Sequence, residues 1–277
     1  MVQKIQHAGQ SGALSFTTRR QLLVLGAAGI WGGFTSPALA QEDGVGPNRG
    51  VVKSDWRGKQ TCNNSDVPAS DPATRITTPS DFIGEGCRMF EDSFEGPYFT
   101  CSPAPGKNIA EGQPGQPLTV AFRLIDGNCQ PVPDGVIDVW ACDATGHYSG
   151  YGFSSDERPP MVRAILFGHI EPDRPQRFCR GALRTDADGI AEFDTIYPGF
   201  YYGTPIHIHF KVHVNGRNLL TSQAIFSEDW NERIMQTAPY NVARPIRRST
   251  DDTGFEKMRI TERGERLVAT LDLVVPT

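Results

Sequence analysis

The chain lacks a continuous apolar stretch long enough to be a confident membrane span, and it lacks any excess of positive charge. Its formal net charge at pH 7 is −5, with 27 Lys and Arg residues against 32 Asp and Glu residues. An acidic chain disfavours non-specific binding to nucleic acid and adhesion to an anionic membrane. We therefore expect no nucleic-acid partner and no stable membrane span after processing.

The sequence also lacks internal repeats and any Cys-x-x-Cys pair, which argues against a thiolate metal site. Six cysteines are present, an even number that suggests disulfides if the chain is exported. Six cysteines allow fifteen pairings if all are joined, and the sequence does not choose among them. One of them, on a predicted strand, is also a candidate free buried thiol (Cys142). The six are Cys62, Cys87, Cys101, Cys129, Cys142 and Cys179.

The first 40 residues predict a twin-arginine export signal rather than part of the fold. The pair Arg19-Arg20 precedes a short apolar stretch over residues 22–34, and residues 38–40 (Ala-Leu-Ala) supply a cleavage pattern. A chance arginine pair before a membrane anchor is the alternative. No Cys follows at the cleavage point, which argues against a lipoprotein. Removal of this leader would take the net charge from −5 to −8, since it carries three basic residues and no acidic one. We expect a bacterial periplasmic or secreted protein.

Residues 41–115 are polar and rich in Gly and Pro, which predicts an extended N-terminal arm. Over residues 116–277, short strand-like runs alternate with turn signals, which predicts one all-β domain, either a sandwich or a barrel. The pair Asn215-Gly216 is a strong hairpin signal. Only residues 228–236, after Ser227 as a plausible N-cap, indicate a helix. The predicted strands span residues 118–125, 136–142, 182–185, 190–193, 206–214, 219–226 and 267–275.

His207 and His209 form a His-x-His pair in a run that favours a strand. Side chains alternate between the faces of a strand, so both imidazoles point to the same face. Two neutral imidazoles side by side suit Zn, Cu, Fe or Ni. Two ordinary surface or core histidines would give the same pattern, so the pair alone does not establish a metal site.

Tyrosines stand at the ends of two neighbouring runs. Tyr148 follows a strand-like run in a Gly-containing loop, and Tyr201 and Tyr202 follow a Pro-Gly turn just before the histidines. A tyrosine titrates near a pKa of about 10, and a nearby multivalent cation favours the phenolate and lowers that pKa. Hard anionic oxygens favour ferric over ferrous iron. Two phenolates and two imidazoles therefore make a coherent Fe(III) site.

Together these segments resemble the intradiol ring-cleavage dioxygenases, the family of protocatechuate 3,4-dioxygenase and catechol 1,2-dioxygenase. The resemblance rests on the order and spacing of several short motifs over about residues 88–275, and it implies a β-sandwich core. The motifs are Glu95-Gly-Pro-Tyr-Phe99, the run Val136-Ile-Asp-Val-Trp140 leading to Gly146-x-Tyr148-Ser149, Thr195-Ile-x-Pro-Gly-x-Tyr201, His207-Ile-His-Phe210 and Ser222-Gln223.

The resemblance implies that Tyr148, Tyr201, His207 and His209 hold a ferric ion, with a catechol and O2 as substrates. In this family the tyrosine that matches Tyr201 leaves the metal and helps to take up a substrate proton. O2 then attacks the ring, which opens between the hydroxyls to give a muconate-type diacid.

Gln223 matches a pocket glutamine of the family and is a candidate for both catalysis and substrate binding. Tyr98 and Thr204 are the other candidate substrate contacts. Thr204 occupies the place of an arginine that family members usually carry before the histidines. Either another arginine reaches the site, such as Arg163, Arg177 or Arg180, or the activity is weak or altered.

Several residues compete for the ligand roles. Tyr202 competes with Tyr201, and Tyr151 competes with Tyr148; the Pro-Gly and Gly-x-Tyr spacings of the family favour Tyr201 and Tyr148. His213 shares the face of the histidine pair if the strand is regular, but it lies further along. The remaining histidines are expected to be solvated, outside the ligand set or removed with the leader: His147, His169 and His7.

Two other functions fit parts of the sequence. One is a transthyretin-like β-sandwich that binds a ligand or partner and has lost catalysis, which the absent arginine favours. The other is a Zn or Cu enzyme that uses only the histidines; no Asp or Glu at suitable spacing completes such a site. The identity of the catechol and the oligomeric state stay open, although the arm could wrap a neighbouring copy.

Overall fold

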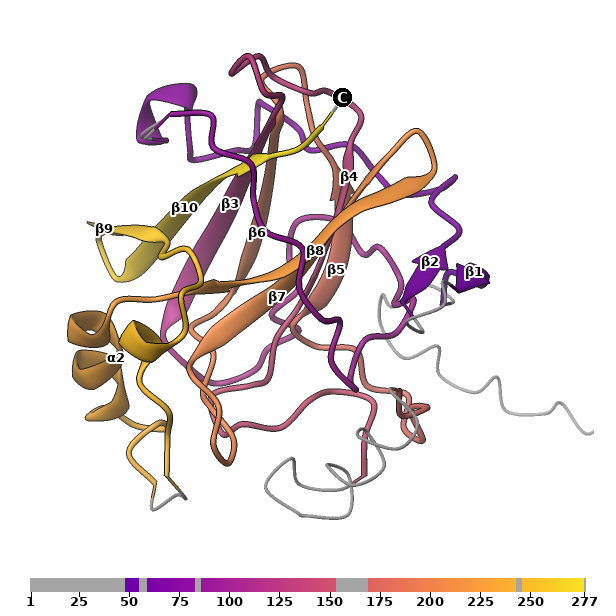
Figure 1. Cartoon of the computed structure of the whole chain (residues 1–277). Helices are drawn as coiled ribbons and strands as arrows, with labels where there is room; N and C mark the ends of the chain where they lie inside the picture. Colours follow the sequence, from indigo (N-terminus) through magenta and orange to yellow (C-terminus); the bar gives the residue numbers. More distant parts are fainter. Residues whose placement is uncertain (1–47, 55–58, 83–85, 153–168, 243–245, 277) are drawn as a thin grey trace, which may run out of the picture. The chain divides into compact units, whose positions relative to one another are not determined.

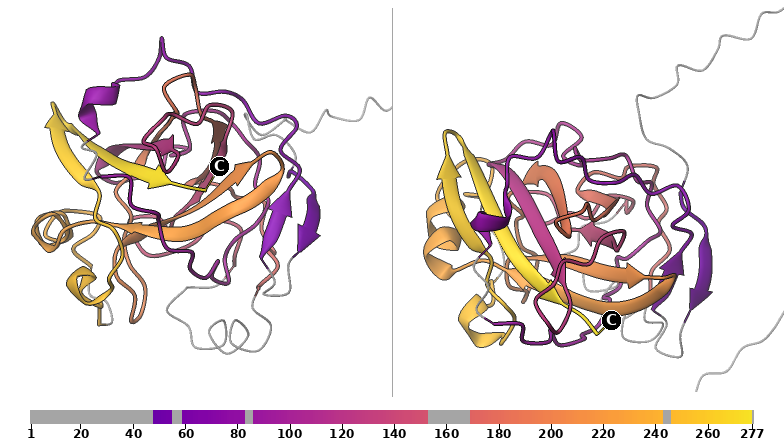
Figure 2. Two further views of the ribbon diagram at one scale, coloured as in Figure 1. Left: turned by 45° about the horizontal axis from the view of Figure 1, so that its top comes forward. Right: turned by 90° about the horizontal axis from the view of Figure 1, so that it is seen from above.

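Two four-stranded sheets form the body of the protein, seen in a computed structural model that describes residues 48–54, 59–82, 86–152, 169–242 and 246–276 (Figures 1 and 2). A separate two-stranded ribbon precedes them, formed by β1 (Val51–Ser54) and β2 (Gln60–Cys62). The predicted export signal lies outside the described residues. None of the helices among the described residues is long and apolar enough to cross a membrane.

The first large sheet has the strand order β6-β3-β10-β9. The long strands β3 and β10 run parallel in its centre, and the other pairs are antiparallel. Its strands are β3 (Pro117–Ile125), β6 (Ile190–Ile196), β9 (Arg259–Arg263) and β10 (Arg266–Val274).

The second large sheet has the order β5-β4-β7-β8, and all its pairs are antiparallel. Its strands are β4 (Val136–Trp140), β5 (Arg180–Arg184), β7 (His207–Val214) and β8 (Arg217–Ile225). One turn joins β7 to β8, and both of its residues have positive φ, 51° at Asn215 and 71° at Gly216. This is the backbone that a tight Asn-Gly hairpin requires, so the predicted hairpin is confirmed.

The main core lies between the two large sheets and is built from the inward-facing residues of both. Ile208, Phe210 and Val212 of β7 meet apolar residues of β3 such as Val120 and Phe122 there, and all five are at most 2% exposed. Every second residue of β7 therefore faces the core. The intervening residues, including both histidines, face away from it.

The all-β prediction and the seven predicted strands are confirmed, with ends that differ by a few residues. The predicted helix is α2 (Glu228–Met235), which begins directly after Ser227. Three strands were not predicted: β1, β2 and β9. The first two are short and lie in the arm, and β9 alternates charged and apolar residues weakly, so none carries a strong strand pattern. Two short 3-10 turns complete the described elements, at Pro79–Asp81 and Thr250–Asp252.

Four of the six cysteines form two disulfides, Cys62–Cys101 and Cys87–Cys129. Both bridges start in the N-terminal segment, and the first ties β2 to the stretch that carries Tyr98. Cys142 and Cys179 are buried and belong to neither of these bridges. The sequence raised a free Cys142 as one possibility, but it could not choose the pairing.

Candidate metal centre

The two predicted metal-binding histidines lie on the outer face of β7, turned away from the main core. His207 and His209 are 3% and 2% exposed, because loops and the N-terminal segment cover this face. Cross-strand pairing places Trp140 of β4 and Gln223 of β8 on either side of His209. Residues paired across a sheet point to the same face, so the Trp140 ring, the His209 imidazole and the Gln223 amide lie side by side on the outer face.

The hydrogen bonding of His207 fixes its tautomer. Its Nδ1 lies 2.8 Å from the Pro205 carbonyl oxygen, which can only accept, so Nδ1 carries the proton and donates. The lone pair of Nε2 then points to Nε2 of His209, 3.0 Å away. In metal sites such a second hydrogen bond orients the ligating imidazole in the same way.

Burial keeps both imidazoles neutral. It lowers the pKa of His207 to about 4, although the Pro205 hydrogen bond opposes the shift. Burial lowers the pKa of His209 well below its usual value, and the neighbouring His207 adds to this effect. Nδ1 of His209 is buried and has no hydrogen-bond partner among the described atoms. Neutral imidazole is the form that binds a metal ion.

Tyr148 and Tyr201 approach the histidines from two loops. Tyr148 Oη lies 3.5 Å from Nε2 of His207, and the Tyr148 side chain is almost fully buried. The ring centre of Tyr201 lies 5.7 Å from that of Tyr148 and 6.1 Å from that of His207. Burial raises the pKa of both tyrosines, so a phenolate here requires a positive charge beside it.

The donor set fits a metal ion of the predicted kind. Two ligand atoms that each lie about 2.1 Å from one ion, at roughly a right angle to each other, are about 3 Å apart. The Nε2 atoms of His207 and His209 are 3.0 Å apart, so one ion could contact both. Phenol oxygens would complete a mixed nitrogen and oxygen set, which suits iron. No three His, Cys, Asp or Glu side chains group as metal ligands within the described ranges. The two tyrosines beside the histidines are the candidate further donors.

Tyr98 lies inside the same aromatic cluster. Its ring stacks on Tyr148 with centres 4.5 Å apart and meets Tyr201 edge-on at 6.0 Å. Two residues earlier, Gly96 has a φ of +77°, and a Cβ there would come within 3.3 Å of Cε1 of His209. This glycine lets the chain pass directly over the histidine.

Gln223 and Thr204 differ in their surroundings. Gln223 is 3% exposed and lies opposite His209 on the outer face. The Thr204 hydroxyl donates to the Tyr201 carbonyl at 2.8 Å and accepts from the Tyr201 amide at 3.2 Å, so it closes the turn that carries Tyr201. Their contacts with substrate stay predictions.

The competing residues point elsewhere. Tyr151 donates its hydroxyl to the Ile170 carbonyl, and the Tyr202 side chain is 47% exposed. His213 does share the outer face, but Asp138 is its nearest charged neighbour, with 3.4 Å between Nε2 and Oδ2. The other two described histidines also contact groups outside the cluster: His147 with Thr145, and His169 with Glu171. His7 and Arg163 lie outside the described residues.

Sequence reasoning did not assign two further side chains to this face. The ring of Trp140 stacks parallel to the His209 ring, with ring centres 4.8 Å apart. Lys211 is fully buried, forms an ion pair with Glu95, and lies 3.5 Å from the centre of the Phe99 ring. Strand alternation after His209 could have placed Lys211 on this face, since the two are two residues apart. The position of Trp140 depends on strand register, which the sequence does not state.

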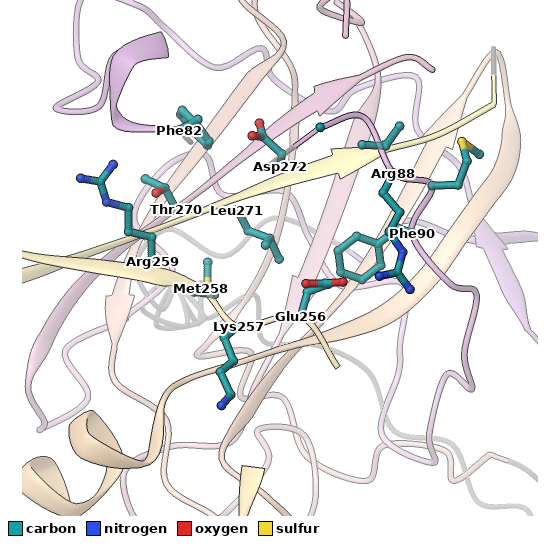
Figure 3. A pocket seen from close by; sticks show the side chains of 13 residues that line it. Phe82, Arg88, Phe90, Glu256, Lys257, Met258, Arg259, Thr270, Leu271 and Asp272 are labelled. Atoms are coloured by element: carbon teal, nitrogen blue, oxygen red, sulfur yellow. The ribbon is translucent and has the colours of Figure 1, made fainter. Parts of the chain in front are cut away.

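A groove of about 470 Å³ lies elsewhere, between β10, the segment before β3 and the residues leading into β9 (Figure 3). Charged side chains such as Arg88, Lys257 and Asp272 line it together with Phe90. None of the predicted site residues borders it, so this groove is separate from the metal centre.

Comparisons with known proteins agree with the geometry. Residues 94–252 match a family model described as Dioxygenase. The chain is 30% identical over 112 residues to the protocatechuate 3,4-dioxygenase beta chain of Burkholderia cepacia, and 39% identical over 61 residues to the intradiol ring-cleavage dioxygenase hqdA of Aspergillus niger. These matches cover 38% and 21% of this chain, and only 42% and 18% of those curated relatives.

Among solved structures, an intradiol ring-cleavage dioxygenase from Tetranychus urticae superposes with a TM-score of 0.59 at 29% identity. The superposition covers 69% of this chain and 95% of that one.

Proposed function

The chain belongs to the intradiol ring-cleavage dioxygenase family, and we propose that it opens the ring of a catechol between its two hydroxyl groups, with O2 as co-substrate. Both oxygen atoms would enter the product, a muconate-type diacid. One observation carries the proposal: Nε2 of His207 lies 3.0 Å from Nε2 of His209 and 3.5 Å from Tyr148 Oη, in a buried aromatic cluster.

The proposed cofactor is Fe(III), held by Tyr148, Tyr201, His207 and His209. When bound, the ion would hold the catechol oxygens and make the ring reactive towards O2. The neutral imidazoles and the tautomer set by the Pro205 carbonyl support the two nitrogen ligands. The closeness of the two tyrosine rings supports the oxygen ligands.

Tyr201 is the proposed proton acceptor. Burial raises the pKa of this tyrosine, so its phenolate oxygen in this place is a strong base once it is not held by a cation. We expect Tyr201 Oη to take the proton from a catechol hydroxyl. Tyr98 and Gln223 would then flank the ring, and the surrounding side chains would exclude water.

The same proposal includes export through the twin-arginine route, with residues 1–40 as the signal. It also divides the rest of the chain into an arm over residues 41–115 and a catalytic domain over residues 116–277. Two disulfides suggest an extracytoplasmic location, because disulfides persist in oxidising compartments. A periplasmic or secreted bacterial protein fits this observation. A homo-oligomer stays an open part of the proposal.

The test uses protein purified from cells supplied with iron. We expect bound iron, a visible tyrosinate-to-iron charge-transfer band, and oxygen uptake with some member of a catechol panel. The product mass should equal that of the catechol plus two oxygen atoms. Tyr201→Phe should shift or abolish the band, whereas Tyr202→Phe, at the exposed neighbouring position, should leave it unchanged.

A second function has one observation in its favour. Thr204 stands where the family usually has an arginine, which fits a β-sandwich that binds a ligand or partner without catalysis. A colourless, iron-free protein from iron-supplied cells would favour this function. A coloured protein that takes up no oxygen with any catechol would retain the metal site and contradict the proposed reaction.

A further inference from the structure

Arg180 is a buried cation in the same cross-strand row as the metal-binding face. It begins β5 and pairs with Trp140 of β4, which in turn pairs with His209 of β7. The strands β5, β4 and β7 are neighbours in the sheet in this order. Arg180 is only 1% exposed, so its side chain is enclosed over the outer face of the sheet.

The guanidinium group of Arg180 joins two segments that are distant in the sequence. Its Nη1 donates to the Tyr98 carbonyl at 2.6 Å. Its Nε donates to Oγ of Ser149 at 2.8 Å, and its Nη2 donates to the Ser149 carbonyl at 3.0 Å. One side chain therefore ties the residue that stacks on Tyr148 to the residue that follows Tyr148 in the chain.

The charge of Arg180 has no carboxylate partner among the described residues, and every hydrogen-bond acceptor that it contacts is neutral. A buried cation without a counter-charge is costly, and guanidinium does not lose its proton in proteins. Its carbon Cζ lies 5.6 Å from the ring centre of Tyr148 and 5.8 Å from that of Tyr151. These aromatic faces offset part of the cost and leave a positive charge beside the proposed ligand.

Of the two other arginines considered as substitutes, Arg177 does not fill this place. Arg163 lies outside the described residues. Arg177 donates to Asn48 Oδ1 at 3.0 Å and to the Arg174 and Gln176 carbonyls at 2.7 Å each, so its hydrogen bonds hold a loop. Of the three, Arg180 is the one with a described contact to Tyr148.

We propose that Arg180 is a positioning residue with two roles. It locks the Tyr98 and Tyr148 segments together, and it supplies a positive charge beside the site. Thr204, in the place where the family usually has an arginine, is neutral and does not supply this charge. The part that concerns iron rests on the proposed function, whereas the locking of the two segments does not. Loss of three hydrogen bonds from one buried group should loosen both segments without disturbing the distant strands β9 and β10.

The experiment compares Arg180→Gln, Arg180→Lys and Arg184→Gln in the full-length protein. Arg184 is the matched control, since it lies on the same strand and donates instead to the carbonyls of Val67 and Asn64. The first readout is amide hydrogen exchange of the metal-free protein. With Arg180→Gln we expect roughly tenfold faster exchange over residues 96–99 and 148–151, and no change in β9 and β10.

The second readout is iron binding. Arg180→Gln should weaken iron binding by about 10–100-fold and shift the charge-transfer band, as loss of an outer partner of a metal ligand does elsewhere. Arg180→Lys keeps the charge but not the planar fork, so it should show the faster exchange with a smaller change in the band. Arg184→Gln should change neither readout in the site segments.

Several results would overturn the proposal. One is exchange and iron binding of Arg180→Gln equal to those of the unmodified protein. Another is equal loosening by Arg180→Gln and Arg184→Gln throughout the chain, which would indicate general destabilisation. If Arg180→Gln does not fold, Ser149→Ala is tested by the same exchange readout. This variant keeps the Arg180 charge and removes the acceptor of Nε, together with the hydrogen bond that the Ser149 hydroxyl donates to the Phe178 carbonyl. If the unmodified protein binds no iron, the proposed function fails while the exchange comparison still tests the positioning role.

Discussion

The two faces of the sheet β5-β4-β7-β8 carry different kinds of side chain, as β7 shows. On β7 the inner face presents Ile208, Phe210 and Val212, and the outer face presents His207, His209, Lys211 and His213. Both faces are buried to nearly the same degree. The inner face packs on another sheet, whereas the outer face is covered by loops and by the N-terminal segment.

This difference shows what apolar and polar side chains each require when they are buried. Apolar side chains need only a partner surface that excludes water, whereas buried polar groups need specific partners. The covering segments supply them: Glu95 pairs with Lys211, and Arg49 pairs with Asp138. At His207 and His209 the imidazole nitrogens face each other instead, and this is the position at which we propose the iron ion.

The largest expected effect comes from the outer face. His209→Ala should abolish the charge-transfer band and reduce oxygen uptake by more than the roughly 10–100-fold typical of losing an outer partner of a metal ligand. His147→Ala, at a side chain that is 46% exposed, is the control and should leave both unchanged. Iron content, absorbance and oxygen uptake measure the effect. A His209→Ala protein with normal iron and activity would remove the functional contrast between the faces.

The next effect comes from the adjacent residue on the inner face. Phe210 is fully buried, and Phe210→Ala should lower the free energy of unfolding by about 3–5 kcal/mol because it leaves a cavity. The folded fraction should keep the band at its usual wavelength, since the ring points away from the site. Urea unfolding and the absorbance of iron-loaded protein test this. A shifted band with unchanged stability would mean that the two faces are not independent.

The smallest effect concerns pH and the ion pairs of the outer face. Burial alone would raise the pKa of Asp138, but Arg49 and His213 outweigh it and lower the pKa to about 2 from its ordinary 3.8; Lys211 also lies nearby. Because the folded-state pKa is depressed, Asp138 stabilises the fold above about pH 4, and this contribution of about 2 kcal/mol is lost as pH falls towards 2.

Asp138→Asn isolates this contribution. The variant should lose less stability than the unmodified protein between pH 5 and pH 2, measured by urea midpoints at each pH. Parallel loss in both proteins would show that Asp138 does not couple the arm to the sheet in this way.

Local patterns predicted the parts of the fold that local chemistry determines. The seven strands followed from alternation and turn residues, and Asn215-Gly216 forms its hairpin because both residues tolerate positive φ. Strand alternation also predicted that both imidazoles of the His-x-His pair point to one face. The arm strands β1 and β2 were missed, since four exposed residues in β1 carry no alternation of apolar and polar types.

The surroundings of the site depend on register and on contacts between distant segments, which no short pattern encodes. Trp140 lies beside His209 only because β4 pairs with β7 at that register. Arg180 contacts the carbonyl of Tyr98, 82 residues earlier in the chain, in a segment outside the sheet. The sequence offered Arg180 as one of three arginines but could not choose it, and it could not pair the cysteines for the same reason.

The central claim is that two phenol oxygens and two imidazole nitrogens meet at one iron ion. A crystal structure of the iron-loaded protein, with the ion located by anomalous scattering at the iron edge, tests it most directly. The claim predicts one iron peak about 2.0–2.2 Å from the side-chain donors of Tyr148, Tyr201, His207 and His209. An iron peak elsewhere, or Tyr148 and Tyr201 oxygens that remain out of reach of an ion held by the histidines, would contradict it.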